Sequence, residues 1–262
     1  LQASSADSDE IISSFSKNNI FASKIASLAD EDLTIRKDGE ILFSKSINSL
    51  EKYWRETSHA IQSIRDNKEI ADSELKLLDK KEFTGLSSNI SFDESQIQRI
   101  NSLTSSPKVA ILREQGVNGQ NEMAAAFTLA GFEAVDVHMQ DLLDRNISLK
   151  EFQGMAVCGG FSYGDVLGAG GGWSKTVMYN TNVKDQFEQF FQDQAKFTLG
   201  VCNGCQMLSN LKQIIPDAEH WPNFKRNLSD QFEARLAQVK IEKTNSVLLE
   251  NMEGWMVPVA SA

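Results

Sequence analysis

The hydrophobic positions of the chain change their pattern near residue 107. Beyond it, short apolar runs alternate with stretches whose apolar residues recur at helical spacing. The runs are residues 108–113, 133–139, 154–158 and 197–201, and the helical stretches are residues 118–131, 183–194 and 206–211. Strands that alternate with helices predict a parallel sheet covered on both faces. We therefore expect an α/β domain with an open, mostly parallel sheet flanked by helices.

Residues 1–83 predict a small α+β segment that precedes this domain. Asp38-Gly39 is a typical turn between two short strands, at residues 33–36 and 41–43. Residues 46–81 carry apolar side chains at helical spacing, and Ser49 is the expected helix start.

The domain boundary is predicted in a polar stretch. Residues 84–107 are rich in Ser, Asn and Thr, as is typical of a linker. We therefore expect a first segment at residues 1–83, a linker at 84–107 and the α/β domain at 108–262. The chain does not begin with Met, and residues 255–262 look like an apolar strand that is cut short. We expect the chain to be a piece of a longer protein.

The amino-acid composition argues against several classes of function. The 262 residues are 41% hydrophobic and 24% charged, with a net charge of −10. This acidic balance argues against binding to nucleic acid or to an anionic membrane surface. No apolar run reaches the roughly 18 residues of a membrane span, and no signal-peptide pattern is present. We expect a cytoplasmic protein whose three cysteines are free thiols.

The main chemical signal is a Gly-x-Cys-x-Gly sequence between a strand and a helix, Gly200-Val201-Cys202-Asn203-Gly204-Cys205-Gln206. In such a nucleophile elbow, a strained turn exposes the nucleophile, and small flanking residues let the turn close. The helix N-terminus favours the thiolate, and the N–H group of Asn203 is placed to face an oxyanion. The pattern predicts Cys202 as a nucleophile. The Gly159-Gly160 turn after the neighbouring strand is expected to supply a second donor, at Gly160.

Other interpretations of Cys202 and Cys205 stay open, because a C-x-x-C sequence is also typical of a redox pair or of half a metal site. A zinc site needs further ligands at matching spacing. The remaining Cys and His residues do not pair up, so we expect no metal; they are Cys158, His59, His138 and His220. We expect Cys205 and Cys158 to be structural thiols that point into packing.

The glycine run at residues 168–172 has two interpretations. A phosphate-binding loop would need Lys-Ser or Lys-Thr at a fixed place after it and a strand directly before it, and both are missing. A mobile or tightly packed loop beside the site is favoured. For the histidines, we expect His138 to be capped or solvated and His220 to lie at a surface or interface.

The sequence resembles the class I (triad-type) glutamine amidotransferases, with their flavodoxin-like fold. More narrowly, it is similar to the C-terminal glutaminase domain of the large single-chain phosphoribosylformylglycinamidine synthases. The matching segments are the cysteine elbow and residues 112–119, 158–167 and 220–235. Residues 1–83 resemble the tail of the synthetase domain of the same family, notably at residues 54–58 and 64–67.

The resemblance implies an ATP-dependent ligase reaction. Glutamine is hydrolysed at Cys202 through a thioester, and ammonia replaces the ATP-activated formyl amide oxygen of formylglycinamide ribonucleotide in purine biosynthesis. L-Glutamine and the upstream synthetase domain are the implied partners. ATP and Mg²⁺ are implied in that synthetase domain and no cofactor in this piece, and a monomer is implied for the full-length protein.

The resemblance also implies roles for individual residues. The oxyanion and glutamine-binding set is Gly159, Gly160, Phe161, Asn203, Gln206, Asn227, Ser229 and Phe232. For Asn227, Ser229 and Phe232, a turn with a buried aromatic side chain remains an equal alternative.

One departure from the family limits the expected activity. There, the catalytic His and Glu follow a Pro-Val-Ala strand as His-Gly-Glu-Gly, whereas Pro258-Val259-Ala260 here stands close to Ala262. We expect the His and Glu beyond Ala262, and little glutamine turnover by residues 1–262 alone. Another class I amidotransferase, a cysteine hydrolase and a non-catalytic C-x-x-C redox module remain as alternatives.

Overall fold

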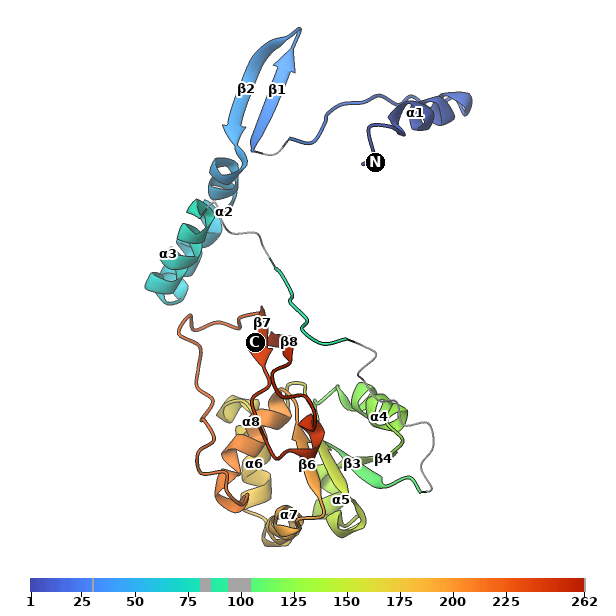
Figure 1. Cartoon of the computed structure of the whole chain (residues 1–262). Coiled ribbons are helices and arrows are strands. Elements are labelled where there is room, and N and C mark those ends of the chain that lie inside the picture. Colours follow the sequence, from blue (N-terminus) through green and yellow to red (C-terminus); the bar gives the residue numbers. More distant parts are fainter. Residues whose placement is uncertain (30, 81–85, 94–104, 262) are drawn as a thin grey trace. The chain divides into compact units, whose positions relative to one another are not determined.

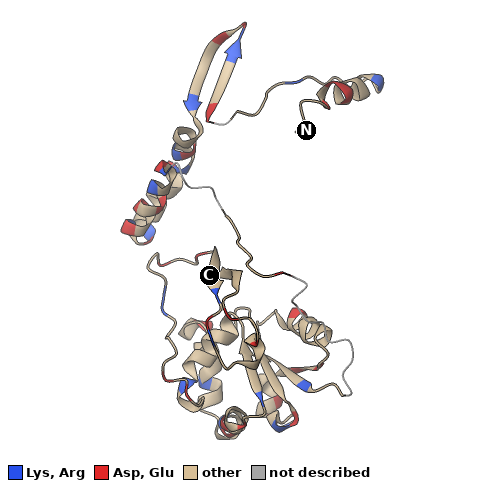
Figure 2. Cartoon of the chain, in the orientation of Figure 1, with Lys and Arg blue, Asp and Glu red and all other residues tan. Residues whose placement is uncertain are grey.

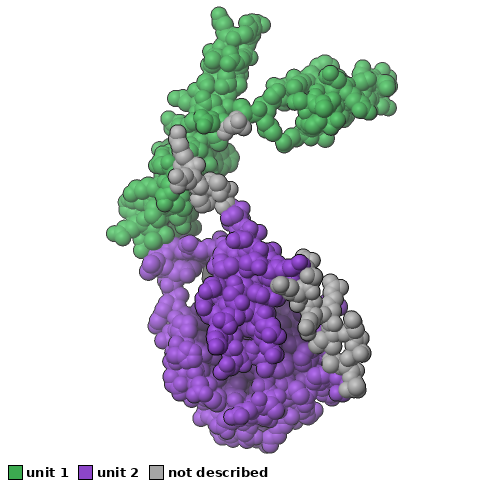
Figure 3. Space-filling model, viewed as in Figure 1, with its two compact units in different colours: residues 1–83 green, residues 84–262 purple. Residues whose placement is uncertain are grey.

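A computed structural model of the chain describes residues 1–29, 31–80, 86–93 and 105–261 (Figure 1). The chain forms two compact units, Leu1–Phe83 and Thr84–Ala262, which Figure 3 shows in different colours. The predicted linker, residues 84–107, lies mostly outside the described residues, so that prediction stays untested.

The first unit contains a hairpin and three helices. Their bounds are α1 (Ser8–Lys17), β1 (Asp32–Lys37), β2 (Glu40–Ser46), α2 (Ile47–Arg65) and α3 (Lys68–Lys76). The antiparallel pairing of β1 and β2 confirms the predicted hairpin. Asp38 and Gly39 form its turn with positive φ angles of 50° and 91°, which a two-residue hairpin turn requires.

The helices of this unit differ in two ways from the prediction. The Ser46 side chain accepts a hydrogen bond from the N–H group of Ser49 and caps α2, so the helix begins at Ile47, two residues before the predicted start. The predicted single helical stretch is two helices, because Asn67 caps α3 and accepts from the N–H groups of Glu69 and Ile70. Helix α1 was not predicted.

One polar contact links α2 to α3, and a second lies within α3. His59 Nε2 lies 2.9 Å from Asp72 Oδ1, and Lys68 Nζ donates to Asp72 Oδ2 over 2.6 Å. The hydrogen bond from Lys68, and after it that from His59, lowers the pKa of Asp72. Figure 2 shows both signs of charge along these helices. Among the described apolar side chains of this unit, only Ala71 is buried, so the unit has little hydrophobic core of its own.

The second unit is built on a parallel sheet. Its strands are β3 (Lys108–Arg113), β4 (Glu133–His138), β5 (Gly154–Val157) and β6 (Phe197–Gly200), in the order β4-β3-β5-β6. All three pairings are parallel, which confirms the predicted α/β fold. Leu112, Val157 and Gly200 lie side by side in register near the carboxyl edge. The segments that follow β3, β5 and β6 therefore leave the sheet close together.

Helices flank this sheet (Figure 1). They are α4 (Gln120–Leu129), α5 (Met139–Leu143), α6 (Gly171–Met178), α7 (Thr181–Gln192) and α8 (Asn203–Asn210). The connection from β3 to β4 runs across the sheet in the opposite direction to those from β4 to β5 and from β5 to β6. Because such crossovers are right-handed, α4 covers one face, and α5, α6 and α7 the other. Helix α8 begins three residues before the predicted start, and α5 and α6 were not predicted.

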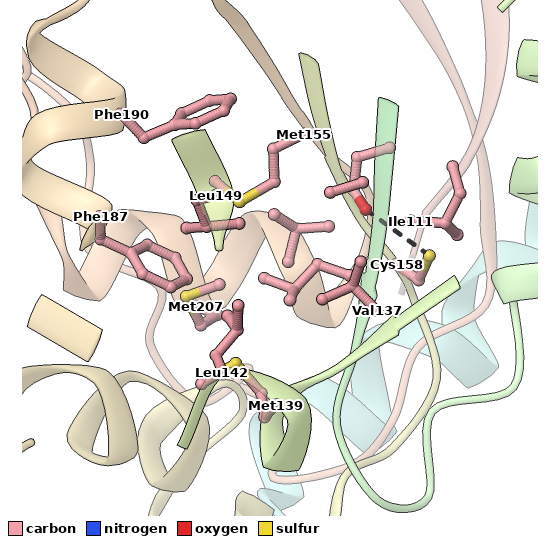
Figure 4. Packing of buried hydrophobic residues seen from close by; sticks show 14 of the residues in the cluster. Ile111, Val137, Met139, Leu142, Leu149, Met155, Cys158, Phe187, Phe190 and Met207 are labelled. Carbon is pink, nitrogen blue, oxygen red and sulfur yellow. Dashed lines mark hydrogen bonds between the residues drawn. The ribbon is translucent and has the colours of Figure 1, made fainter. Parts of the chain in front are cut away.

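The hydrophobic core of this unit lies between the sheet and its helices. In Figure 4, Phe187 of α7 lies beside Met207 of α8, and Ile111 of β3 lies beside Cys158. Each such side chain, once buried, contributes about 1.5–3 kcal/mol. On the α4 face, the rings of Phe127 and Phe132 meet edge to face with centroids 5.4 Å apart. This core holds the sheet, and with it the carboxyl ends of the strands, in a fixed arrangement.

A second, two-stranded sheet completes the unit. Strands β7 (Arg235–Lys240) and β8 (Met256–Ser261) pair antiparallel, which confirms the predicted apolar strand around Pro258. Phe92 stacks on Trp255 with ring centroids 4.3 Å apart, so residues 86–93 run beside these strands. Strand β7 was not predicted. Short 3-10 turns are η1 (Leu77–Asp79), η3 (Leu149–Glu151), η4 (Tyr163–Leu167), η5 (Lys212–Ile214) and η6 (Val247–Leu249).

The length and polarity of the helices bear on membrane insertion. Across the described ranges, no helix combines the length and the apolar character that spanning a bilayer requires.

Candidate active site

Cys202 stands at a sharp turn between β6 and α8. Its backbone has φ 52° and ψ −117°, a conformation that non-glycine residues rarely adopt. The turn is fixed on both sides, because Val201 N–H donates to the carbonyl of Val157 (3.0 Å) and Gly204 N–H to that of Val201 (2.9 Å). The side chain of Cys202 is exposed. Strand, strained turn, exposed thiol and helix follow one another as the elbow pattern predicts.

Close packing accounts for the two glycines that flank this turn. A Cβ atom on Gly204 would lie 2.2 Å from the carbonyl oxygen of Val157. On Gly200 it would lie 2.6 Å from Leu208 Cδ1 and 3.0 Å from the Cα of Cys205. Both distances are shorter than van der Waals contact, so any larger residue would push α8 away from the sheet.

The loop after β5 lies directly against the nucleophile. A Cβ atom on Gly159 would be 3.0 Å from the Cβ of Cys202 and 3.9 Å from its Sγ. Gly160 has φ 117°, which only glycine adopts without strain. Within the described part of the chain, the N–H groups of Gly160 and Asn203 donate to no protein acceptor. Both predicted oxyanion donors are therefore free to bind a ligand.

The segment after β3 supports this loop from behind. Gly119 N–H donates to the carbonyl of Gly159 over 3.2 Å, and Tyr163 N–H to that of Gln115 over 3.1 Å. A Cβ atom on Gly160 would lie 2.6 Å from both the backbone N and the Oδ1 of Asn118. The segments that follow β3, β5 and β6 thus meet at one edge of the sheet, where open α/β sheets bind ligands.

A carboxylate and an amide join the loop to the elbow. The buried Asn203 donates from Nδ2 to the carbonyl of Gly160 (2.9 Å) and to Asp165 Oδ2 (2.6 Å). Asp165 also accepts hydrogen bonds from both the N–H and the hydroxyl group of Ser162, and from Gly170 N–H. Sequence reasoning gave Asp165 no role. The Ser162-x-x-Asp165 spacing is a capping-box signal, but it cannot reveal Gly170 and Asn203 as partners.

Two of the predicted glutamine-binding aromatic residues lie together. Phe161 and Phe232 meet edge to face with ring centroids 6.3 Å apart, although residue 232 follows the elbow by thirty positions. Both rings are largely exposed, at 72% and 67%. They form an open apolar surface beside the Gly159–Gly160 turn. The alternative of a buried aromatic side chain at residue 232 is therefore wrong.

Asn227 and Ser229 belong to a turn that is bonded within itself. Asn227 Nδ2 donates to the carbonyl of Gln231 (2.9 Å), and the Ser229 hydroxyl donates to Glu233 Oε1 (2.6 Å). The hydrogen bond from Ser229, followed by that from Arg235, lowers the pKa of Glu233. Both polar side chains thus have intramolecular partners. Gln206 is half-buried in the first turn of α8, and its N–H donates to the carbonyl of Cys202.

The other two thiols have different surroundings. Cys158 is fully buried, with its Sγ 3.8 Å from the Ala156 carbonyl (Figure 4), and burial raises its pKa to about 11. This confirms the structural role predicted for Cys158. The prediction for Cys205 is wrong, because its side chain is exposed. It lies on the first turn of α8, where only part of its thiol is covered; burial, then the nearby Cys202, raises its pKa.

Two of the three histidines have partners other than Cys202, and the third is exposed. His138 caps α5, and its Nδ1 accepts from Gln140 N–H, as expected of a capped histidine. Its strand, β4, is three positions from β6 in the sheet, or about 14 Å at the usual strand spacing. Its Nε2 lies 4.0 Å from the buried carboxylate of Glu114. His59 belongs to the first unit, and His220 is exposed in a loop.

The glycine run is a packed loop that begins α6. Gly170, in a left-handed conformation (φ 67°), would place a Cβ atom 2.4 Å from the backbone N of Met207 in α8. The run thus packs against the helix that carries the nucleophile, which agrees with the packed-loop interpretation. Among the residues that the structure describes, no three His, Cys, Asp or Glu side chains are grouped to hold a metal ion.

An α/β sheet with a strained, exposed cysteine at a strand–helix turn and a glycine loop beside it defines the class of cysteine-dependent α/β hydrolytic domains. Residues 106–262 match the CobB/CobQ-like glutamine amidotransferase domain. The chain belongs to this family. The match confirms the glutamine amidotransferase domain that the cysteine elbow predicted.

One solved structure is similar to part of the chain. It is described as the structure of PurLQS from Thermotoga maritima. The similarity covers 60% of this chain and 67% of that chain, with 20% sequence identity and a TM-score of 0.45.

Proposed function

We propose that Cys202 hydrolyses the side-chain amide of L-glutamine and so releases ammonia. The observation that carries this proposal is the contact between the exposed, strained Cys202 and Gly159, beside two backbone N–H groups without protein acceptors. Family membership indicates the substrate class. Phe161 and Phe232 are proposed to line the glutamine site, with Gln206, Asn227 and Ser229 near its amino-acid end.

The proposed chemistry has two stages. The Cys202 thiolate attacks the amide carbon, a C–S bond forms, and the carbonyl π electrons move to the oxygen. The N–H groups of Gly160 and Asn203 donate to this oxyanion. Its collapse breaks the C–N bond, and the nitrogen takes a proton from water and leaves as ammonia. Water then cleaves the thioester and gives glutamate. We assign none of the three histidines as the base.

The direct test is covalent labelling, since alkylation needs the nucleophile and the binding site but not complete turnover. The full chain is treated with a diazo-ketone analogue of glutamine, and the adduct is mapped by mass spectrometry. We expect an adduct at Cys202 that L-glutamine suppresses and D-glutamine does not. Cys202→Ala should abolish labelling, and the matched variant Cys205→Ala should retain it. Labelling at Cys205 alone, or equal suppression by the two enantiomers, would contradict the proposal.

We also propose a destination for the ammonia. The resemblance of residues 112–119, 158–167 and 220–235 to phosphoribosylformylglycinamidine synthases supports transfer to formylglycinamide ribonucleotide in the cytoplasm. ATP and Mg²⁺ would act in the synthetase part of the enzyme, and no step at Cys202 requires them. In the enzyme that includes this synthetase, Cys202→Ala should abolish glutamine-dependent but not ammonia-dependent synthesis. Loss of both the glutamine-dependent and the ammonia-dependent synthesis would contradict the proposed transfer of ammonia.

A redox function is the second candidate, because Cys202 and Cys205 are both exposed on one helical turn. In that case a mild thiol oxidant should form a Cys202–Cys205 disulfide, with the loss of two hydrogens. Replacing Cys205 would then abolish function. Retained glutamine-analogue labelling in Cys205→Ala favours the hydrolytic function instead.

A further inference from the structure

Asp165 lies where three separately folded segments meet. It belongs to η4, directly after the Gly159–Phe161 loop, and its carboxylate is half-buried. It contacts Ser162 in its own segment, Gly170 at the start of α6, and Asn203 in the elbow. Gly170 in turn packs against the backbone of Met207 in α8. A single side chain thus connects the glycine loop, the nucleophile turn and the helix that follows it.

The hydrogen bonds require two acceptor oxygens at this position. Oδ2 accepts from Ser162 N–H (2.9 Å) and from Asn203 Nδ2 (2.6 Å). Oδ1 accepts from the Ser162 hydroxyl and from Gly170 N–H, both at 3.0 Å. All four partners are donors, and only a group with two acceptor oxygens satisfies them. An asparagine would turn one of these oxygens into a donor that faces at least one N–H donor.

Asn203 transmits this restraint to the loop beside Cys202. With Nδ2 fixed by Asp165, the same nitrogen donates to the Gly160 carbonyl and so sets the orientation of the peptide plane after Gly160. A trans peptide holds its C=O and N–H groups in one plane, on opposite sides. This plane carries the N–H group of Phe161, whereas the predicted donor, Gly160 N–H, lies in the preceding plane. The contact therefore holds Gly160 through its carbonyl group, and it restrains the residue that carries the predicted donor.

We propose that Asp165 is a positioning residue that fixes the Gly159–Phe161 loop against the nucleophile turn through Asn203, so that the loop stabilises the oxyanion formed at Cys202. The proposal rests on the proposed glutamine hydrolysis. Asp165 touches neither substrate nor thiol. Its contribution is preorganisation, which fixed donors require in order to stabilise developing charge.

The test compares two reagents on the same thiol. The glutamine-mimicking diazo-ketone needs a formed oxyanion site, whereas iodoacetamide needs only an accessible thiolate. In Asp165→Asn we expect Cys202 labelling by the diazo-ketone to slow by about tenfold or more, as for the loss of an oxyanion donor. Iodoacetamide labelling of Cys202 should stay within about twofold of the unmodified chain. Asp165→Glu, which keeps both acceptor oxygens, should recover part of the diazo-ketone rate.

A matched control is available in α5. Asp141 has the same local role, since its carboxylate accepts from the N–H group of His138 in a capping box, but it lies at the end of β4. Asp141→Asn should leave both labelling rates at Cys202 unchanged.

If Asp165→Asn does not unfold cooperatively, Asn203→Ala is the second variant, because it removes the amide link but keeps the Asp165 contacts to Ser162 and Gly170. It should show the same selective loss.

Each outcome has a definite meaning. Unchanged diazo-ketone labelling in Asp165→Asn and Asn203→Ala would overturn the proposal. Equal losses with both reagents would also overturn it, because Asp165 would then only keep the elbow folded. A glutamine-protected adduct on the unmodified chain is the reference; without it, the glutamine function itself fails. The failure of one proposal is therefore distinguishable from the failure of the other.

Discussion

The three thiols differ in accessibility because each occupies a different position on the same fold. Cys158 lies inside the sheet at the end of β5, whereas Cys202 and Cys205 lie on the turn and the first helical turn after β6. Burial raises the pKa of Cys158 to about 11. Thiols react as thiolates, so both burial and protonation protect Cys158.

Alkylation should therefore be selective. At about pH 7.5, iodoacetamide should modify Cys202 and Cys205 in the folded chain and leave Cys158 intact. Because the pKa of Cys205 is raised, its rate should increase as the pH rises towards that pKa. Peptide mapping by mass spectrometry measures all three sites, and denaturant should expose Cys158. Rapid modification of Cys158 in the folded state would contradict its position.

Gly204 offers a second test at the scale of single residues. In Gly204→Ala, the new methyl group would lie 2.2 Å from the carbonyl oxygen of Val157, and this backbone atom cannot yield easily. We expect a loss of about 1–3 kcal/mol of stability, measured by thermal unfolding. The control is Gly171→Ala, also at a helix start, where the methyl group would meet Leu167 Cβ at an ordinary 3.6 Å. An equal destabilisation by both substitutions would contradict the packing of α8 on the sheet.

At the scale of elements, the sequence pattern was informative where periodicity and burial agree. Strands β3, β5 and β6 are mainly apolar runs, β4 alternates apolar and polar residues, and the predicted segments contain all four. Helices α5 and α6 were missed because α5 is a single turn at a strand end and α6 begins within a glycine run. Contacts between distant segments, such as Phe161 with Phe232, carry no local signal. The nucleophile was predictable from its neighbours in sequence. The role of Asp165 was not, because it depends on hydrogen bonds to Gly170 and Asn203, which the sequence does not show.

The contact between α2 and α3 should depend on pH. The pKa of Asp72 is lowered in the folded state, chiefly by Lys68 and then by His59. A depressed carboxyl pKa adds stability above the ordinary value of 3.8, and this stability is lost as the pH falls through the folded-state pKa. Helical content of the first unit, measured by circular dichroism, should therefore decrease as the pH falls below 3.8.

A substitution isolates this contribution at neutral pH. Asp72→Asn should speed hydrogen exchange in α3 by roughly twofold, as expected for an exposed ion pair. Glu69→Gln removes the same charge from α3 but leaves the contacts of Asp72 with His59 and Lys68 intact, and it should have a smaller effect. Identical exchange in the two variants would show that the Asp72 contacts do not stabilise the helix pair.

At the scale of the whole molecule, the two units differ in how much apolar surface they bury. The core cluster lies in the second unit, whereas many large apolar side chains of the first are exposed, including Trp54, Ile61 and Ile64. Local stability follows buried contacts. The first unit should therefore open more readily than the sheet that supports the candidate active site.

Hydrogen exchange measured by mass spectrometry tests this difference. Amides of β3 and β5 should exchange at least about tenfold more slowly than those of β1 and β2. Both pairs of strands are hydrogen-bonded within their sheets, so the comparison isolates burial from hydrogen bonding. Equal protection in the two sheets would contradict the described difference in packing.

The positive φ angle of Cys202 has a consequence for the evolution of related sequences. A backbone at φ 52° and ψ −117° suits glycine better than any residue with a Cβ atom. Either cysteine codon becomes a glycine codon by a single-base change. In a lineage where selection on the thiol is relaxed, that change should therefore be favoured for stability. Relatives with glycine at this position and an otherwise intact elbow would be the expected record of lost chemistry, recognisable without any assay.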